Sequence, residues 1–285
     1  MRIQLSAIAV AISLTLTHQV ASANSVASAT LGPISVTLID LNPADSLLPT
    51  ITWNNATYAP YNNYTYVYAY DTANGNYQSN VAWGENVGTS NSLSASTAQS
   101  AASASISGAS DDTRLDGVSL TSAGYADGTT SAGNYSSFNA AAYAPYNGYD
   151  AFTLGAFTGV IFTAYATTSA QTSVGDDSWG NEYASSNASL NVWGSQPSGN
   201  GGSQNSHSSI NSYASTYYGL SNSAADMLGG TYINLTGSDK VGYLQFYTSV
   251  YGYSYVASAV AEPESYALVL AGLSLMGMIS RRKQK

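Results

Sequence analysis

The chain contains no cysteine and very little charge. The absence of cysteine excludes disulfide bonds and metal sites built on thiolates. Only 8% of the 285 residues are charged, compared with about 25% in a typical soluble domain, and seven Lys and Arg are outnumbered by 16 Asp and Glu. All the cations except Arg114 and Lys240 lie at the two ends of the chain. Because nucleic acids and anionic lipids are bound by clustered cations, the acidic body is not expected to bind nucleic acid.

Side chains suited to acid–base catalysis are also scarce. The only histidine besides His18 is His207, and its Gly/Ser/Asn-rich surroundings predict a solvated loop over residues 196–207 rather than part of a Ser-His-Asp triad. Glycoside hydrolysis needs two carboxyl groups at a set separation. The candidate acids are Asp111, Asp112, Asp116, Asp176, Asp177 and Glu182. Adjacent acids on a strand point to opposite faces, so neither doublet forms such a pair, and we expect that the protein is not an enzyme.

Residues 1–23 have the composition of a secretory signal peptide. Arg2 supplies the positive start, an apolar run extends from Leu5 to Leu16, and Ala21-Ser22-Ala23 has the small residues of a cleavage site. The apolar run is shorter than the about 20 residues that a membrane-spanning helix needs. We therefore expect cleavage after Ala23 and a mature chain that begins at Asn24. An uncleaved helix is the alternative.

The C-terminal residues 260–285 combine three features in a fixed order. These are Ala261-Glu262-Pro263-Glu264, the apolar segment Tyr266–Ile279, and the cationic residues Arg281, Arg282 and Lys283. Cations beside an apolar helix remain on the cytoplasmic side, which places the body across the inner membrane. An apolar run of 14 residues is only marginally long enough to span a bilayer, so a transmembrane helix over 266–280 suits a temporary anchor.

This tail resembles the PEP-CTERM sorting tail of Gram-negative bacteria, which is also labelled an ice-binding protein C-terminal domain. The resemblance rests on Glu262-Pro263, the Ala271-Gly272-Leu273 step in the apolar segment and the terminal Arg-Arg pair. It implies an exported precursor held transiently in the inner membrane, then recognised by exosortase around Glu262-Pro263, in bacteria that make extracellular polysaccharide. The tripeptide is usually Pro-Glu-Pro, and Ala261 stands in place of its first proline. A plain C-terminal membrane anchor is the alternative.

The body, residues 24–259, is a series of short strand-like runs. Apolar and polar residues alternate over 34–38, tyrosines alternate with smaller residues over 64–70, and Val160, Phe162 and Ala164 alternate with Ile161, Thr163 and Tyr165. Alternate positions of a strand point to opposite faces. Turn-forming pairs such as Asn74-Gly75 and Asp116-Gly117 separate the runs, and long helical periodicity is missing. These features predict one all-β domain, an antiparallel β-sandwich of jelly-roll-like type. Because large aliphatic residues are few, its core is expected to use tyrosine.

Two further expectations concern the layout of the strands. Residues 93–106 are assigned to strands, and the runs 233–235, 241–250 and 253–255 are expected to form a meander, with Gly252 dividing the last two. Ice binding would need a flat and regular array of threonines, and the sequence contains no such repeat.

Aromatic residues are the most conspicuous material of the body. The chain has 24 Tyr, 4 Trp and 5 Phe. Tyr64, Tyr66, Tyr68 and Tyr70 fall on one face of a strand, about 6.6–6.8 Å apart. Rings that carry a hydroxyl group can stack on the apolar face of a sugar, so this row is a candidate glycan contact. Tyrosine is also an ordinary strand former and core residue, which is the alternative.

One segment could bind a hard cation. Asp176, Asp177, Asn181 and Glu182 offer carboxylate and amide oxygens within a turn-rich stretch, and such oxygens are the ligands of Ca²⁺. The EF-hand spacing is missing, and acids solvated in a loop are the alternative. No other cofactor is expected.

The sequence therefore predicts an exported, exosortase-sorted protein of the cell surface or extracellular matrix. Its expected role is structural or interactive, in association with the exopolysaccharide of a biofilm matrix. A carbohydrate-binding module or adhesin that uses its aromatic faces is the alternative. The expected partners are exosortase, the inner membrane transiently, and extracellular polysaccharide.

Overall fold

Fifteen β-strands and their turns form the described part of the computed structural model, which covers residues 24–54, 62–72, 75–108, 111, 113–128, 134–145, 151–173, 182–195, 202–215 and 218–255. Sheet A contains β1 (Asn24–Leu31), β2 (Ser35–Asp40), β6 (Asn91–Ser96), β7 (Ser100–Ser107), β8 (Ser119–Asp127), β11 (Thr158–Thr172) and β14 (Ser221–Ile233). Sheet B contains β3 (Ile51–Trp53), β4 (Asn63–Asp71), β5 (Asn76–Gly84), β9 (Tyr135–Ala144), β10 (Phe152–Leu154), β12 (Glu182–Ser195), β13 (Ser203–Ser215) and β15 (Lys240–Tyr255). Every strand pairing is antiparallel, which confirms the predicted all-β, sandwich-like fold for these residues.

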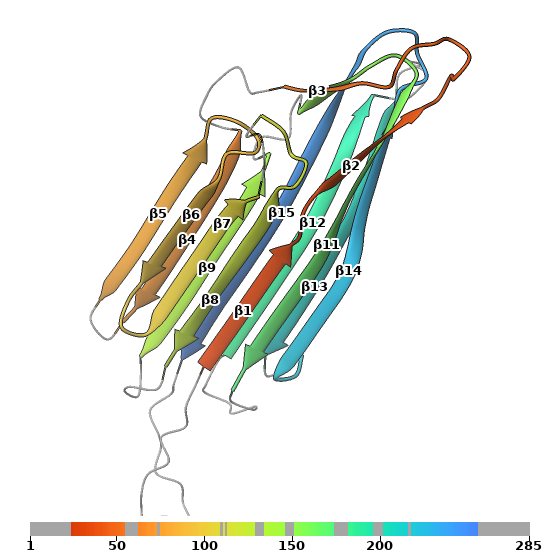
Figure 1. Cartoon of the computed structure of the whole chain (residues 1–285). Helices are drawn as coiled ribbons and strands as arrows, with labels where there is room; N and C mark the ends of the chain where they lie inside the picture. Colours follow the sequence, from red (N-terminus) through yellow and green to blue (C-terminus); the bar gives the residue numbers. More distant parts are fainter. Residues whose placement is uncertain are drawn as a thin grey trace, which may run out of the picture.

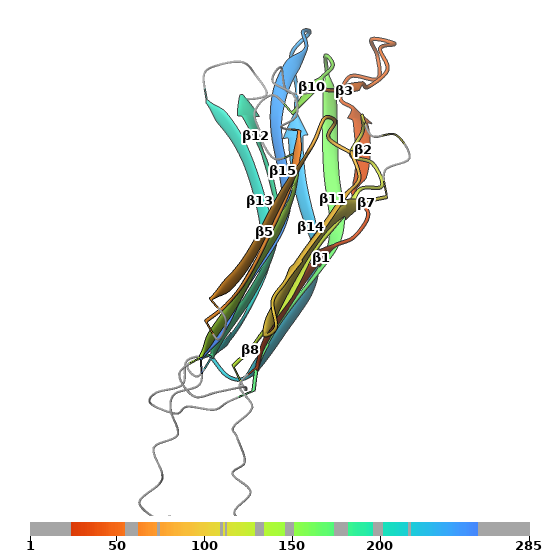
Figure 2. The same ribbon diagram turned by 90° about the vertical axis from the view of Figure 1, so that its left-hand side faces the viewer.

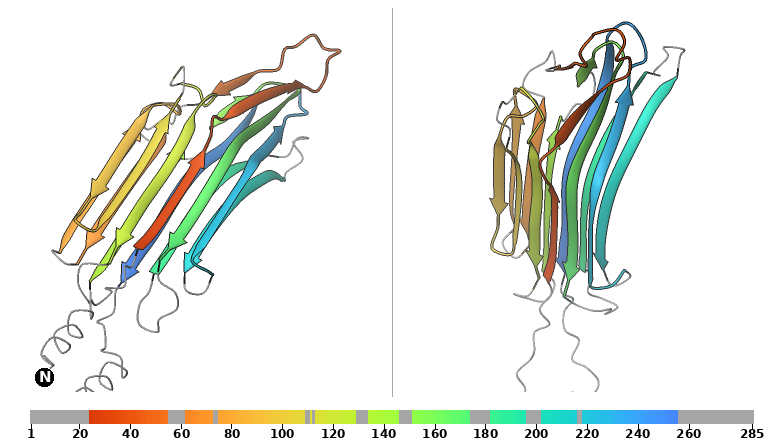
Figure 3. Two further views of the ribbon diagram at one scale, coloured as in Figure 1. Left: turned by 60° about the horizontal axis from the view of Figure 1, so that its bottom comes forward. Right: turned by 45° about the vertical axis from the view of Figure 1, so that its right-hand side comes forward.

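The two sheets lie face to face as two layers (Figures 1 and 2). Sheet A has the order β14-β11-β1-β8-β7-β6, and β2 also pairs with β11; sheet B has the order β13-β12-β15-β9-β4-β5, and β10 joins β3 to β15. Figure 3 shows the long strands of both layers running side by side. The Oγ of Ser25 in β1 donates to the carbonyl of Tyr253 in β15 at 2.5 Å, so the described chain enters and leaves the sandwich at the same end.

Within the residues just described, no helix is long and apolar enough to cross a membrane. The predicted signal peptide (1–23), the sorting tail (260–285) and its helix over 266–280 lie outside the described residues.

Strand alternation decides which side chains fill the space between the sheets. In β4, Thr65, Val67 and Ala69 are fully buried, whereas the tyrosines between them are half-buried. Tyr232 is the one tyrosine in the core cluster of the described residues, and its hydroxyl donates to the carbonyl of Val241 at 2.9 Å. The described core therefore uses tyrosine, as expected, but at this one position. Alanine, leucine, valine and phenylalanine take most inward positions, because a buried hydroxyl there would need a hydrogen-bond partner of this kind.

One end of the core is aromatic. Phe152 of β10 and Phe246 of β15 come from sheet B, and both rings meet Phe162 of β11, with centroids 5.5 and 6.3 Å away. Tyr232 of β14 meets Phe152 edge-on at 5.5 Å, and Trp53 of β3 lies 6.3 Å from the same ring. Edge-to-face and tilted contacts of this kind add to the stabilisation from burial. The cluster therefore joins the two sheets where the short strands β3 and β10 lie.

Amide side chains join the edge strands of the two sheets. Gln204 of β13 donates its Nε2–H to the carbonyl of Ile233 in β14 at 2.7 Å and accepts the N–H of the same residue at 3.0 Å. At the other edge, Gln78 of β5 accepts the N–H of Ser96 in β6 at 3.2 Å, and Asn80 donates to the carbonyl of Ser94 at 3.0 Å. These bonds occupy backbone groups that an open edge would offer to another strand.

Two predictions about strand layout were wrong. β14 belongs to sheet A and β15 to sheet B, so the C-terminal runs do not form a meander. Gly252 lies within β15 without interrupting it, at an inward position where a Cβ would lie 2.5 Å from the Phe138 ring. Residues 203–207 belong to β13 rather than to a loop, because the backbone ladder with β12 forms without apolar side chains. The strands predicted over 93–106 are confirmed as the β6–β7 hairpin.

Candidate functional site

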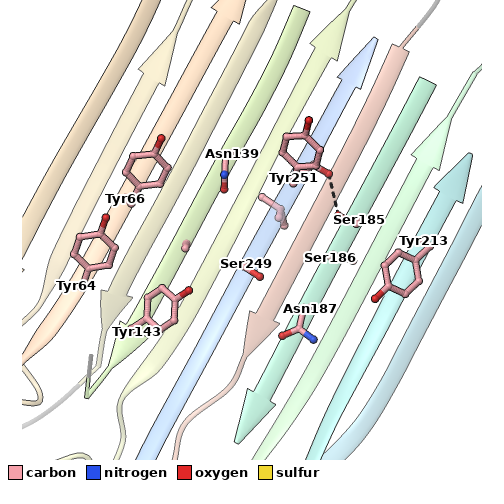
Figure 4. A pocket seen from close by; sticks show the side chains of 12 residues that line it. Tyr64, Tyr66, Asn139, Tyr143, Ser185, Ser186, Asn187, Tyr213, Ser249 and Tyr251 are labelled. Atoms are coloured by element: carbon pink, nitrogen blue, oxygen red, sulfur yellow. Dashed lines mark hydrogen bonds between the residues drawn. The ribbon is translucent and has the colours of Figure 1, made fainter. Parts of the chain in front are cut away.

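The four tyrosines predicted to share a strand face lie on the outer face of sheet B. Tyr64, Tyr66, Tyr68 and Tyr70 are the outward, half-buried residues of β4. The ring centroids of Tyr64 and Tyr66 are 6.5 Å apart with planes only 6° from parallel, and those of Tyr68 and Tyr70 are 6.4 Å apart at 16°. Figure 4 shows the rings of Tyr64 and Tyr66 with their faces toward the viewer. The two rings of each pair are therefore nearly parallel along the strand.

Neighbouring strands extend this aromatic surface across the sheet. Tyr64 is opposite Tyr143 of β9 and Trp83 of β5 in the strand register, and its ring centroid lies 5.9 and 4.4 Å from theirs. Tyr143 in turn is opposite Tyr247 of β15, with centroids 5.3 Å apart. The four rings form a continuous band over β5, β4, β9 and β15, which we call the first tyrosine band.

A second tyrosine band crosses the same face farther along the strands. The Tyr70 ring lies 6.1 Å from that of Tyr135 in β9, which lies 5.8 Å from Tyr253 in β15. Tyr253 lies 5.9 Å from Tyr183 in β12, and Tyr251 is 6.1 Å from both Tyr183 and Tyr253. Aromatic side chains from four strands thus meet at a second level of the sheet.

Small side chains between the two bands leave an open trough. Asn187 of β12, Ser249 of β15 and Ala141 of β9 follow one another across the strands in register, and Tyr66 of β4 comes next in the same row. The trough has a volume of about 520 Å³. Its aromatic sides are formed by Tyr64, Tyr66, Tyr143, Tyr213 and Tyr251 (Figure 4). Since its floor follows one cross-strand row, the trough runs across sheet B from β13 to β4.

Amide and hydroxyl groups supply the polar lining of the trough. Asn187 donates its Nδ2–H to Oδ1 of Asn211, while its own Oδ1 is buried with no hydrogen-bond partner among the described residues. Ser185 donates its hydroxyl to the carbonyl of Tyr251 at 3.3 Å. Among the described residues that line the trough there is no Asp, Glu, Lys, Arg or His. The surface can therefore exchange hydrogen bonds with a ligand without offering charge to it.

Burial keeps several of the phenols protonated. It is the main reason that the pKa of Tyr251 is raised to about 12, and a hydrogen bond with Tyr135 and the neighbouring phenols add to the effect. Burial is also the main cause that raises the pKa of Tyr253, and the neighbouring phenols of Tyr135 and Tyr183 raise it further. The pKa of Tyr68 is raised in the same way, first by burial and then by the phenols around it. These hydroxyl groups stay neutral and able to donate at any ordinary pH.

The outer face of sheet A has a different chemistry. Its side chains are mainly Ser, Thr and Ala, and the hydroxyl groups of Thr30 and Thr167 bond to each other at 2.6 Å. Thr121 is opposite Thr30 on the next strand, so three threonines lie in one row although the sequence has no threonine repeat. Tyr125 and Tyr165 are exposed on this face, but neither belongs to a tyrosine band. This face therefore offers tyrosines that can serve as controls for those of sheet B.

The predicted calcium ligands are only partly described. Glu182 is the first residue of β12 and is 3% exposed; its carboxylate accepts the N–H of Ser173 at 2.8 Å and the hydroxyl of Ser254 at 3.4 Å. Asp176, Asp177 and Asn181 lie outside the described residues. In the described segments no group of three or more His, Asp and Glu could hold a metal ion. The calcium site therefore stays a prediction.

Other residues singled out in the sequence fall in two places. His207 is an exposed residue of β13, where its Nδ1 shares a hydrogen bond with Oδ1 of Asn191, so its predicted exposure to solvent is confirmed and its assignment to a loop was wrong. The cleavage residues Ala21 and Ala23, the sorting residues Ala261, Glu262, Pro263 and Glu264, and the stop residues Arg281, Arg282 and Lys283 lie outside the described residues.

Sequence reasoning missed most of the trough. Tyr143 comes from β9, Tyr251 from β15 and Asn187 from β12, and Tyr247 of β15 completes the first tyrosine band beside the trough. One signal was present: Tyr247 and Tyr251 fall out of phase with the buried Phe246, which marks them as outward residues of the same strand. That alternation predicts their face, but not which strands lie beside them.

No protein-family model, curated protein or solved structure matches this chain. Its fold and surface chemistry are therefore the basis for assigning a function.

Proposed function

We propose that this chain is an exported, non-catalytic glycan-binding protein whose trough on sheet B holds a segment of neutral polysaccharide. The observation that carries the proposal is the trough itself. Tyrosine rings stand along its sides, and its floor carries amide and hydroxyl groups (Figure 4). Binding sites for uncharged ligands typically combine aromatic walls with a few polar groups that fix orientation.

The two kinds of lining match the two kinds of surface on a sugar. A pyranose ring has an apolar C–H face, which can lie on the nearly parallel rings of Tyr64 and Tyr66. Its rim carries hydroxyl groups that both donate and accept hydrogen bonds. Asn139, Asn187 and Ser249 line the trough, and their amide and hydroxyl groups are of the kinds that donate and accept such bonds.

The shape and charge of the trough favour an extended neutral chain. The trough crosses the strands from β13 to β4, which is about 19 Å at the usual strand spacing. A compact small molecule is normally enclosed over most of its surface, and an open trough cannot enclose it in this way. Because the described residues of the lining include no cation, acidic polysaccharides gain no charge pair there, and the acidic body repels them at low salt.

The proposed location is the cell surface or the extracellular matrix. It is supported by the signal-like residues 1–23 and by the tail over 260–285, which combines a marginal membrane helix with a cationic stop. In this proposal exosortase processes an inner-membrane precursor, and the released protein keeps a jelly-roll-like sandwich. Asn24 and Tyr255 lie at the same end of the sandwich, so a tether there leaves the outer face of sheet B accessible.

Affinity electrophoresis tests the glycan-binding proposal. The protein is run through gels that contain hydroxyethylcellulose, galactomannan or dextran, and we expect at least one of them to retard it. An aromatic contact of about 1.4 kcal/mol corresponds to tenfold in affinity, so Tyr66→Ala and Tyr251→Ala should each weaken retardation up to about tenfold. Tyr165→Ala on sheet A is the matched control and should migrate as the wild type does.

Three results would contradict the proposal. If the mobility of the protein were unchanged in every glycan, the protein would have no defined glycan-binding site, and a structural role in the matrix would remain. Equal losses in Tyr66→Ala and Tyr165→Ala would show that the trough is not the binding surface. Release of reducing ends that disappears on substitution of one carboxylate would indicate a hydrolase. Mass spectrometry of both ends of the exported protein tests the location separately.

A further inference from the structure

A further pair of nearly parallel rings lies on the outer face of sheet B, outside the trough. Trp193 of β12 is opposite Tyr243 of β15 in the strand register. Their ring centroids are 5.7 Å apart and their planes are 7° from parallel. Both side chains are half-buried and point outward, because their neighbours Val192 and Leu244 are fully buried in the core. We call this pair the tryptophan platform.

The tryptophan platform lies at a definite distance from the trough. Tyr243 precedes Ser249 of the trough floor by six residues on the same strand, which corresponds to about 20 Å. Gln245, Asn191 and His207 occupy one cross-strand row between them, and Nδ1 of His207 is hydrogen-bonded to Oδ1 of Asn191. Polar groups thus continue along the face from one aromatic region to the other.

We propose that the tryptophan platform is a second subsite, which binds another segment of the same neutral polysaccharide. The inference rests on the proposed function of the trough. The platform has the same combination of flat rings and adjacent amide groups. No Asp, Glu, Lys or Arg is an outward residue of the described strands around it, which are β10, β12, β13 and β15. A tryptophan ring offers the largest face for stacking.

The two subsites should make affinity depend on chain length. A platform of two rings is too small to hold a glycan firmly by itself. A polymer already seated in the trough presents its next segment at a high effective concentration, which converts a weak contact into a gain in overall affinity. An oligosaccharide shorter than about 20 Å cannot reach both places, so it should be indifferent to the platform.

The test compares the polysaccharide that retards the wild-type chain in affinity electrophoresis with its own short fragments. Binding of the whole polysaccharide and of its fragments to the protein is measured by calorimetry and by tryptophan fluorescence. Trp193→Ala and Tyr243→Ala should each weaken polymer binding about tenfold and leave fragment binding unchanged. Trp193→Phe should retain polymer binding, Tyr66→Ala in the trough should weaken both ligands, and Tyr165→Ala on sheet A should weaken neither.

The outcomes separate this inference from the function on which it rests. Wild-type polymer affinity in both Trp193→Ala and Tyr243→Ala would overturn the second subsite while the trough stands. Equal loss for polymer and fragments in these variants would also overturn it, because the platform would then act on the trough itself. If Trp193→Ala does not fold, the polymer and fragment affinities of Tyr243→Ala and Trp193→Phe decide whether the platform is a subsite. Failure of the wild type to bind any glycan would instead refute the proposed function.

Discussion

Adding one methyl group at Gly124 should destabilise the core beneath the trough. Gly124 occupies an inward position of β8, and a Cβ built on it would lie 2.2 Å from a ring carbon of Phe138 in β9. Ordinary Cβ contacts are 3.4–4 Å, so the ring would have to retreat by more than 1 Å. It has no room to retreat, since Gly252 of β15 approaches it so closely that a Cβ there would lie 2.5 Å from the ring. The ring is thus held between the two sheets.

The magnitude follows from this confinement. Overpacking of a dense core typically costs about 1–3 kcal/mol, and a ring that is confined from both sheets places Gly124→Ala near about 3 kcal/mol. For a body of this size, the melting temperature should then fall by about 6–12 °C. Urea unfolding followed by tryptophan fluorescence measures the loss directly. Gly229→Ala is the matched control, because its Cβ would meet nothing closer than 3.9 Å, and it should change stability by less than about 0.5 kcal/mol.

A double mutant makes the prediction specific to the ring. Phe138→Leu alone should destabilise the protein by leaving a cavity. Combined with Gly124→Ala, it should cost less than the sum of the two single changes, since the smaller side chain leaves space for the new methyl group. The reasoning is refuted if Gly124→Ala is as stable as Gly229→Ala, or if the two changes add without coupling.

Three further predictions address pH, a buried turn and salt. Tyr251 has a pKa of about 12 in the folded protein and near 10 in the unfolded chain, so its contribution to stability should be intact below pH 10 and should be lost between about pH 10 and 12. Tyr251→Phe should flatten that fall in stability. A titration in which all phenols have ionised by pH 10 would contradict the prediction. Asn234 is fully buried and shares its Nδ2–H groups among the carbonyls of Leu154, Gly155 and Ser238, so Asn234→Ala should lower the unfolding free energy by about 3 kcal/mol; a loss below 1 kcal/mol in urea would exclude that role. Glycan retardation should change less than about twofold between low and high salt, since the trough residues that the structure describes are uncharged, and a steep salt dependence would point to another surface.

The faces of individual strands could be predicted from the sequence with elementary geometry. Alternation assigned Tyr64 and Tyr66 to one face of β4, and the structure places both on the outside of sheet B. The same rule assigned Val160 and Phe162 to a common face of β11, and both are buried. These assignments hold because successive residues of a strand point to opposite sides whatever lies next to it.

Composition was a poorer guide than alternation. The small number of large aliphatic residues suggested that the core uses tyrosine, yet Tyr232 is the one tyrosine of the described core. Small alanines fill many of the inward positions, and phenylalanines such as Phe138 and Phe162 fill much of the remaining space. The Ser- and Asn-rich residues 196–207 suggested a loop, yet residues 203–207 form part of β13. In both cases the structure is decided by how closely the two sheets and the backbones approach each other, which residue counts do not report.

The sequence by itself determined that the body is built of β-strands, that it is acidic and free of cysteine, and which side chains of a strand point together. Only the tertiary structure decided that Asn187, Ser249 and Ala141 form one row between two tyrosine bands. The physical reason is range. The direction of a side chain is fixed by the local geometry of its own strand, whereas the neighbour across a sheet is chosen by backbone hydrogen bonds between residues far apart in the chain.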